Sequence, residues 1–127
     1  MSSNYHLIEK GTHIIIDISE IENIEILKYT DSIIKILDEI INKFNLNVVN
    51  KAIHQFEPFG VTGVYVLSES HLSIHTFVEE RKVAMDLYTC RTFNEPVKII
   101  NFIKKLFDNS SESSSSFSNI TYRIIER

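Results

Sequence analysis

Hydrophobic residues recur along the chain with two different spacings, and each spacing predicts a different kind of element. Between residues 33 and 44 the apolar side chains come at intervals of three and four, the pattern of a helix with one buried face. Residues 30–32 (Thr-Asp-Ser) suit the N-terminal cap of a helix, and residues 45–47 end the pattern. The sequence therefore predicts a helix that begins near residue 30 and ends by residue 45.

A second helix is predicted to begin at Asn94-Glu95-Pro96, because proline is favoured in the first turn. Its expected core-facing residues are Val97, Ile99, Ile100, Ile103, Leu106 and Phe107. The segment 108–119 that follows is rich in serine and low in complexity, and we expect it to form a flexible loop.

Short runs rich in β-branched residues predict strands instead. These runs cover residues 13–18, 48–56, 63–67, 83–90 and 120–125. The fourth run alternates, so one set of side chains should meet helices and the other should face a site. The first set is Val83, Met85 and Leu87, and the second is Ala84, Asp86, Tyr88 and Cys90. Residues 79–82 suit a charged hairpin tip, whereas residues 20–28 are compatible with a short helix or an irregular connection.

In chain order these elements run β-α-β-β-β-α-β, with the last strand at a sheet edge. This order predicts an α+β fold, a two-layer α/β sandwich in which the helices cover one face of a largely antiparallel sheet. A chain of 127 residues should form a single domain, 1–127. The face without helices needs a cover, which predicts a homodimer with a site near its interface.

Composition narrows the class of protein. The chain is 43% hydrophobic and 24% charged, which is typical of globular proteins, and its formal charge of −4 argues against nucleic acid as a partner. No apolar run approaches the roughly 20 residues that span a membrane, and the first residues lack the pattern of a signal peptide. A single cysteine cannot form an internal disulfide, so we expect a cytoplasmic protein.

Candidate chemistry is concentrated between residues 67 and 90, where a hydroxyl, imidazoles and the only thiol occur together. Ser70 and His75 provide a nucleophile and a base, the minimum for covalent chemistry. Taken alone, such a pair is more often a surface serine beside a half-buried histidine. A lone free cysteine such as Cys90 is usually a small buried apolar residue.

A longer match changes that balance. The segment Glu69-Ser70-His71-x-x-x-His75, the upstream run Phe-Glu-Pro-x-Gly-Val-Thr-Gly at 56–63, and Cys90 together resemble the self-cleaving S-adenosylmethionine decarboxylases of the short bacterial and archaeal form. The resemblance implies that the Ser70 hydroxyl attacks the Glu69 carbonyl and that the chain separates into 1–69 and 70–127. It also implies that Ser70 becomes a covalent pyruvoyl group, the electron sink for decarboxylation.

The resemblance implies roles for further residues. His75 matches the histidine that accepts a proton during processing, and Cys90 matches the cysteine that returns a proton to the substrate. Thr62 stands where many relatives carry a serine that supports processing, and it keeps the hydroxyl. Phe56 matches an aromatic ring that binds adenine and the sulfonium cation, and Glu79 matches a carboxylate that binds the ribose hydroxyls.

No metal site is expected. His71 and His75 would suit one zinc ion if they lay on a helix. In an extended segment they would be about 13 Å apart, too far for one ion, and the residues after Ser70 have the pattern of an extended segment.

The leading hypothesis is a pyruvoyl-dependent S-adenosylmethionine decarboxylase that supplies aminopropyl groups for spermidine and other polyamines. A first alternative keeps the machinery but acts on arginine or ornithine, as the resemblance also allows, because relatives of this family decarboxylate these amino acids. Thr62, Phe59 and Phe77-Val78 depart from the usual pattern and leave the substrate open. A second is a non-catalytic, unprocessed homologue. A third is a cysteine hydrolase that uses Cys90 with a histidine.

Overall fold

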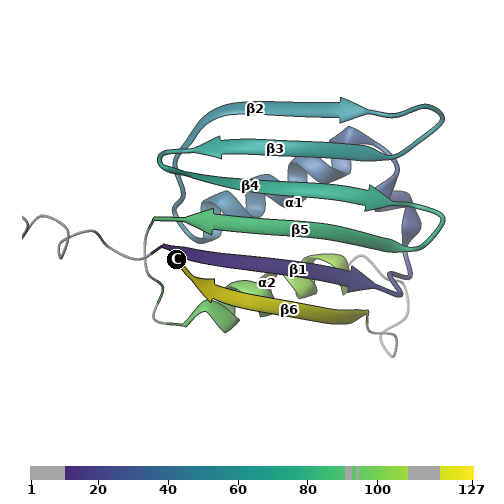
Figure 1. Cartoon of the computed structure of the whole chain (residues 1–127). Coiled ribbons are helices and arrows are strands. Elements are labelled where there is room, and N and C mark those ends of the chain that lie inside the picture. The colour runs from purple at the N-terminus through teal and green to yellow at the C-terminus, as the bar shows by residue number, and fades with distance from the viewer. Residues whose placement is uncertain (1–10, 91–92, 94, 109–117) are drawn as a thin grey trace, which may run out of the picture.

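The protein is a two-layer α+β sandwich, described here by a computed structural model that covers residues 11–90, 93, 95–108 and 118–127. The strands are β1 (Thr12–Ser19), β2 (Val48–Gln55), β3 (Val61–Leu67), β4 (Ser70–Phe77), β5 (Lys82–Thr89) and β6 (Asn119–Glu126), and the helices are α1 (Thr30–Lys43), α2 (Pro96–Asp108) and the short 3-10 helix η2 (Ile24–Leu27). Both α-helices lie behind the sheet in the view of Figure 1. This arrangement leaves the other face of the sheet open.

The described strands form one six-stranded sheet in the order β2-β3-β4-β5-β1-β6, and every neighbouring pair is antiparallel. The predicted fold class is therefore confirmed, as is the edge position of the last strand. The predicted order was wrong in one respect, because it omitted β4. This strand has only two buried core residues, Leu72 and Ile74, and places the polar His71, Ser73 and His75 on its open face.

The core lies between the helices and one face of the sheet. Val83, Met85 and Leu87 are buried there, as the alternation predicted, together with Ile14, Ile16 and Ile18 of β1. Val97 was expected in this core but is 43% exposed. At 3.6 residues per turn, it lies roughly 100° from the centre of the stripe that the other buried residues of α2 form.

The start of α1 differs from the predicted cap. The helix begins at Thr30, and Tyr29 before it provides no side-chain cap. Instead, Gln55 at the end of β2 accepts the Thr30 N–H at 2.9 Å and donates to the carbonyl oxygens of Lys28 at 2.8 Å and Gly60 at 3.0 Å. A residue 25 positions away thus satisfies the helix terminus, which no local pattern of residues 30–32 could reveal.

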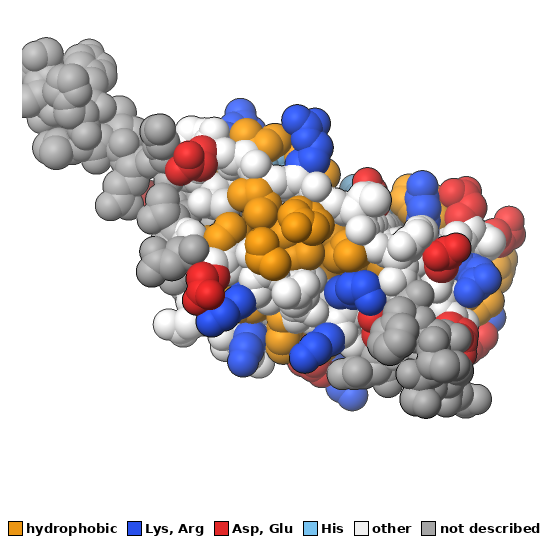
Figure 2. All heavy atoms as spheres, turned by 90° about the horizontal axis from the view of Figure 1, so that it is seen from below, with side chains coloured by type: hydrophobic (Ala, Val, Ile, Leu, Met, Phe, Trp, Pro, Cys, Tyr) orange, Lys and Arg blue, Asp and Glu red, His pale blue; other side chains and the backbone are white. Residues whose placement is uncertain are grey.

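Some apolar side chains remain at the surface. Seen from the β6 side, hydrophobic side chains gather in the middle of the face and charged ones surround them (Figure 2). On the open face of the sheet, Val66 is 44% and Phe77 39% exposed.

No described helix has the length and hydropathy needed to cross a membrane. The predicted loop at 108–119 falls mostly outside the described residues.

Candidate active site

The predicted cleavage bond lies in a two-residue turn between β3 and β4. β3 ends at Leu67 and β4 begins at Ser70, so Ser68 and Glu69 form the turn. Glu69 has a φ of 61°, a left-handed conformation that costs a residue with a side chain roughly 1–2 kcal/mol. The Glu69-Ser70 bond therefore lies at the strained tip of a tight hairpin.

The end of β5 brings the thiol of Cys90 to this turn. Cys90 Sγ lies 2.9 Å from the main-chain oxygen of Glu69 and donates a hydrogen bond to it. The Ser70 hydroxyl donates to the oxygen of Ser68 at 3.2 Å. The hydroxyl, the neighbouring carbonyl and the thiol thus meet at one end of the sheet. Such an arrangement can stabilise negative charge on the carbonyl oxygen when a nucleophile attacks it.

A second pair of site residues lies near the other end of the same strands. Thr62 of β3 is directly opposite His75 of β4, and Thr62 Oγ1 is 3.2 Å from His75 Nδ1. Ser70 and His75 are five residues apart on an extended strand, which separates them by about 16 Å. The structure therefore places His75 beside Thr62 but not beside the Ser70 of the same chain.

Phe56 and Glu79, the two predicted substrate-binding residues, line one hollow at the same end of the sheet as Thr62 and His75. The hollow has a volume of about 250 Å³ and is lined by Phe56, Phe59, Gly60, Thr76, Phe77, Val78, Glu79 and Glu80. Gly60 has a φ of +115°, which favours glycine, and its oxygen accepts the N–H of Phe56 at 2.8 Å. This turn holds the Phe56 ring at the rim, where it is 47% exposed.

The β3–β4 turn and the two turns that flank this hollow lie at opposite ends of the sheet in Figure 1. The candidate residues therefore form two groups within one protomer. Ser70, Cys90 and the Glu69 carbonyl make the first, and Thr62, His75, Phe56 and Glu79 make the second.

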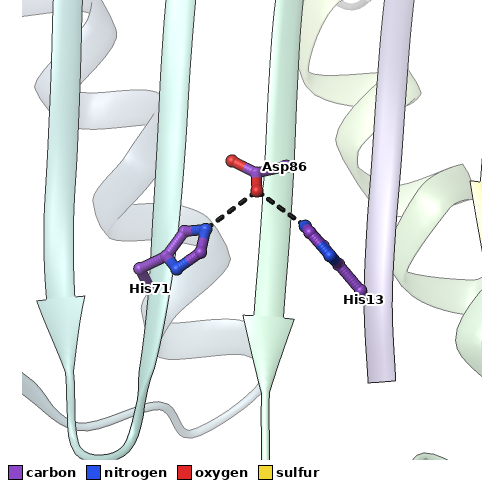
Figure 3. A group of neighbouring side chains, drawn as sticks. All are labelled: His13, His71 and Asp86. Atoms are coloured by element: carbon purple, nitrogen blue, oxygen red, sulfur yellow. Dashed lines mark hydrogen bonds and ion pairs between the residues drawn. The ribbon is translucent and has the colours of Figure 1, made fainter. Parts of the chain in front are cut away.

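A third group, which the sequence did not predict, lies on the open face of the sheet near Ser70. Asp86 of β5 stands between His13 of β1 and His71 of β4, and its Oδ2 is 2.8 Å from the Nε2 atom of each imidazole (Figure 3). Its other oxygen, Oδ1, accepts a hydrogen bond from the hydroxyl of Ser73. Alternation had placed Asp86 on the site face, but only the pairing of β5 with β1 brings His13 beside it.

This environment keeps Asp86 ionised. Burial alone would raise the pKa of its carboxyl group, but the hydrogen bonds from Ser73, His71 and His13 outweigh it and lower the pKa.

His71 and His75 are four residues apart on the extended β4, as predicted, so they do not share a metal ion. Among the described residues, His13, His71 and Asp86 are the group whose ligand atoms, within 4.8 Å of one another, could hold one.

Comparisons with known proteins agree with the resemblance seen in the sequence. The sequence model of the S-adenosylmethionine decarboxylase family matches residues 12–119. A proenzyme of that name from Thermosipho melanesiensis is 41% identical over 96 residues, which are 76% of this chain and 73% of the relative. One from Thermodesulfovibrio yellowstonii is 38% identical over 98 residues, which are 77% and 72% of the two chains.

A solved structure extends the likeness to the fold. The crystal structure of the adenosylmethionine decarboxylase from Aquifex aeolicus matches with a TM-score of 0.79 and 25% identity, over 94% of this chain and 91% of that one. The match includes the sheet that carries both groups of candidate residues. The chain therefore belongs to the S-adenosylmethionine decarboxylase family.

Proposed function

We propose that this chain is the precursor of a pyruvoyl-dependent S-adenosylmethionine decarboxylase that cuts itself between Glu69 and Ser70. The product of such an enzyme donates aminopropyl groups for polyamine synthesis. The observation that carries this proposal is that the Cys90 thiol, at the end of β5, meets Ser70 and the Glu69 carbonyl at one strained turn. Family membership supplies the reaction class, and these three groups supply the chemistry.

The processing step uses the turn directly. The Ser70 hydroxyl attacks the carbonyl carbon of Glu69, and the carbonyl oxygen, which gains negative charge, accepts the hydrogen bond from Cys90. The C–N bond then breaks to give an ester. Elimination releases Glu69 as a carboxylate, and hydrolysis of the remaining dehydroalanine releases ammonia and leaves the keto group. Once formed, the pyruvoyl group supplies the electron sink for decarboxylation.

The base for this chemistry comes from a second copy of the chain. One protomer does not bring its own His75 to its own Ser70, because about 16 Å of extended strand separates them. Two sheets that stack through their open faces about a twofold axis would bring the first group of each protomer to the second group of the other. The exposed Val66 and Phe77 on that face support this homodimer.

The hollow at the second end suits the substrate. The Phe56 ring offers an aromatic face to a sulfonium cation, which contributes roughly 0.5–2 kcal/mol. The exposed carboxylate of Glu79 can accept both ribose hydroxyls.

Cys90 is a free thiol, which suits a reducing compartment, so we place the enzyme in the cytoplasm.

A substrate assay tests this function. Purified protein should release carbon dioxide from carboxyl-labelled S-adenosylmethionine and not from labelled arginine or ornithine, and Ser70→Ala should release none. Release from arginine or ornithine alone would reassign the substrate. Ester or amide hydrolysis that depends on Cys90 in an uncut chain would replace the proposal with a hydrolase.

A further inference from the structure

The proposed reaction leaves the cluster of His13, His71 and Asp86 without a role. Asp86 uses both carboxylate oxygens: Oδ2 accepts from the two imidazoles, and Oδ1 accepts from Ser73. Two of these three donors, His71 and Ser73, belong to β4, and the third belongs to β1. Through His71 and His13, Asp86 ties β4 across β5 to β1 (Figure 3). Through Ser73 it holds β4 at the next side chain of the open face as well.

The hydrogen-bond pattern favours a structural role for this cluster, a clamp in which Asp86 fixes β4 through hydrogen bonds, over a metal site. Two imidazoles and a carboxylate are suitable zinc ligands. A metal-bound imidazole, however, carries a proton on its outer nitrogen and needs an acceptor for it. The outer nitrogen of His13, Nδ1, lies 3.4 Å from Nη1 of Arg127, and a guanidinium can only donate. His13 is therefore placed to accept at Nδ1 and to donate from Nε2 to Asp86.

Cleavage creates the need for such a clamp at the start of β4. Ser70 pairs with Leu67 of β3 but has no partner on β5, whereas His71 pairs with both Val66 and Tyr88. When the Glu69-Ser70 bond is cut, residue 70 loses its covalent link to the turn. When its nitrogen leaves as ammonia, residue 70 also loses its N–H. His71 is then the first residue of β4 that the sheet holds on both sides.

We propose that Asp86 is a positioning residue that, through His71 and Ser73, holds the new end of β4 and thus residue 70 in place after the chain is cut. This inference rests on the proposed function and adds a residue outside the reacting groups. Asp86 touches neither Ser70 nor Cys90 among its hydrogen-bond partners. A substitution of Asp86 should therefore lower the turnover rate but not the rate of self-cleavage, because the intact turn holds residue 70 until the bond breaks.

Asp86→Asn is the informative variant, because an amide has a single oxygen to offer its three donors. We expect it to be cut about as fast as wild type but to lose turnover, with kcat lower by up to about 100-fold and KM little changed. His71→Gln keeps an N–H donor near the position of Nε2 and should retain much of the activity that His71→Ala loses. Asp31→Asn, the same chemical change in the first turn of α1, should behave as wild type.

The outcomes separate the clamp from its alternatives. Normal turnover in Asp86→Asn would overturn the clamp and leave the proposed function intact. A parallel loss of cleavage and turnover in Asp86→Asn would overturn it in favour of a merely structural residue. About one zinc ion per wild-type protomer, with turnover lost in a chelator, would make the cluster a metal site. A wild-type chain that is never cut would overturn the proposed function and the clamp together.

Discussion

The thiol of Cys90 donates a hydrogen bond to the main-chain oxygen of Glu69, with 2.9 Å between the sulfur and the oxygen. The two residues are 21 positions apart and meet because β5 ends beside the β3–β4 turn. In the proposed reaction, this oxygen gains negative charge when Ser70 attacks. In the proposed reaction, the same thiol assists cleavage first and returns a proton to the product later.

This contact predicts two separate effects of the substitution Cys90→Ala. The variant should still be cut between Glu69 and Ser70, but about 10-fold or more slowly, because one donor to the developing oxyanion is lost. It should also lose turnover, because no thiol returns the proton. A denaturing gel followed over time, together with carbon dioxide release, measures the two effects separately.

Cys90→Ser is the matched control for the first effect, since its hydroxyl can still donate to the Glu69 oxygen. It should be cut faster than Cys90→Ala. If Cys90→Ala is cut at the wild-type rate and keeps full turnover, the cysteine has no part in the chemistry.

The proposed homodimer, in which His75 of one chain meets Ser70 of the other, predicts that two defective chains can repair each other. Ser70→Ala and His75→Ala should each remain uncut alone. Coexpressed with different tags, they form a mixed dimer in which the Ser70 of one chain meets the His75 of the other. Chains that carry His75→Ala should then be cut, as intact mass of the purified mixed dimer would show.

The reciprocal pairing provides the control. In a mixed dimer of wild type with Ser70→Ala/His75→Ala, the wild-type Ser70 faces a partner that lacks the imidazole, and it should stay uncut. Cleavage of the wild-type chain in that dimer, with none in the first, would mean that His75 acts within its own protomer.

Gln55 is predicted to link the stability of α1 to the turn that carries Phe56. Its amide accepts the Thr30 N–H and donates to the carbonyl oxygens of Lys28 and Gly60. Gln55→Ala should lower the free energy of unfolding by about 1–3 kcal/mol, since it leaves helix-terminal and turn groups without partners. Urea unfolding of the Ser70→Ala precursor, which remains one chain, measures this. An unchanged midpoint would show that water replaces Gln55 without cost.

The clamp also predicts a dependence of stability on acid. Hydrogen bonds hold the pKa of Asp86 below its ordinary value, so the folded state binds this proton less readily than the unfolded state. Its contribution to stability is therefore complete above about pH 4, the ordinary pKa of an aspartate, and declines as pH falls below it. The Ser70→Ala precursor should lose more stability between pH 5 and pH 3 than the same precursor with Asp86→Asn. Equal losses would contradict the lowered pKa.

Local patterns predicted much of the fold. The spacing of apolar residues in α1 and the alternation in β5 predicted both elements and most of their buried residues. Ile36 of α1 is buried although it was not expected in the core. The omission of β4 has a physical cause. Its open-face residues His71, Ser73 and His75 are polar, so the strand shows little of the apolar character that marked the others.

The site was predicted residue by residue but not in its arrangement. The motif gave Ser70, His75 and Cys90 as candidates, and the sequence correctly indicated an extended segment after Ser70. An extended strand, however, places His75 far from Ser70, a consequence that appears only when the strands are assembled. The contacts of Asp86 with His13, and of Gln55 with Thr30, depend on pairings across the fold that no local spacing encodes.

Intact mass of the purified wild-type chain under denaturing conditions tests the central claim most directly. Self-cleavage at Glu69-Ser70 predicts two chains, 1–69 and 70–127, the second carrying a keto group in place of its amino terminus and therefore resistant to Edman degradation. Ser70→Ala should give one chain of full mass. A wild-type protein that stays whole under all conditions, or that is cut at another bond, would contradict the account.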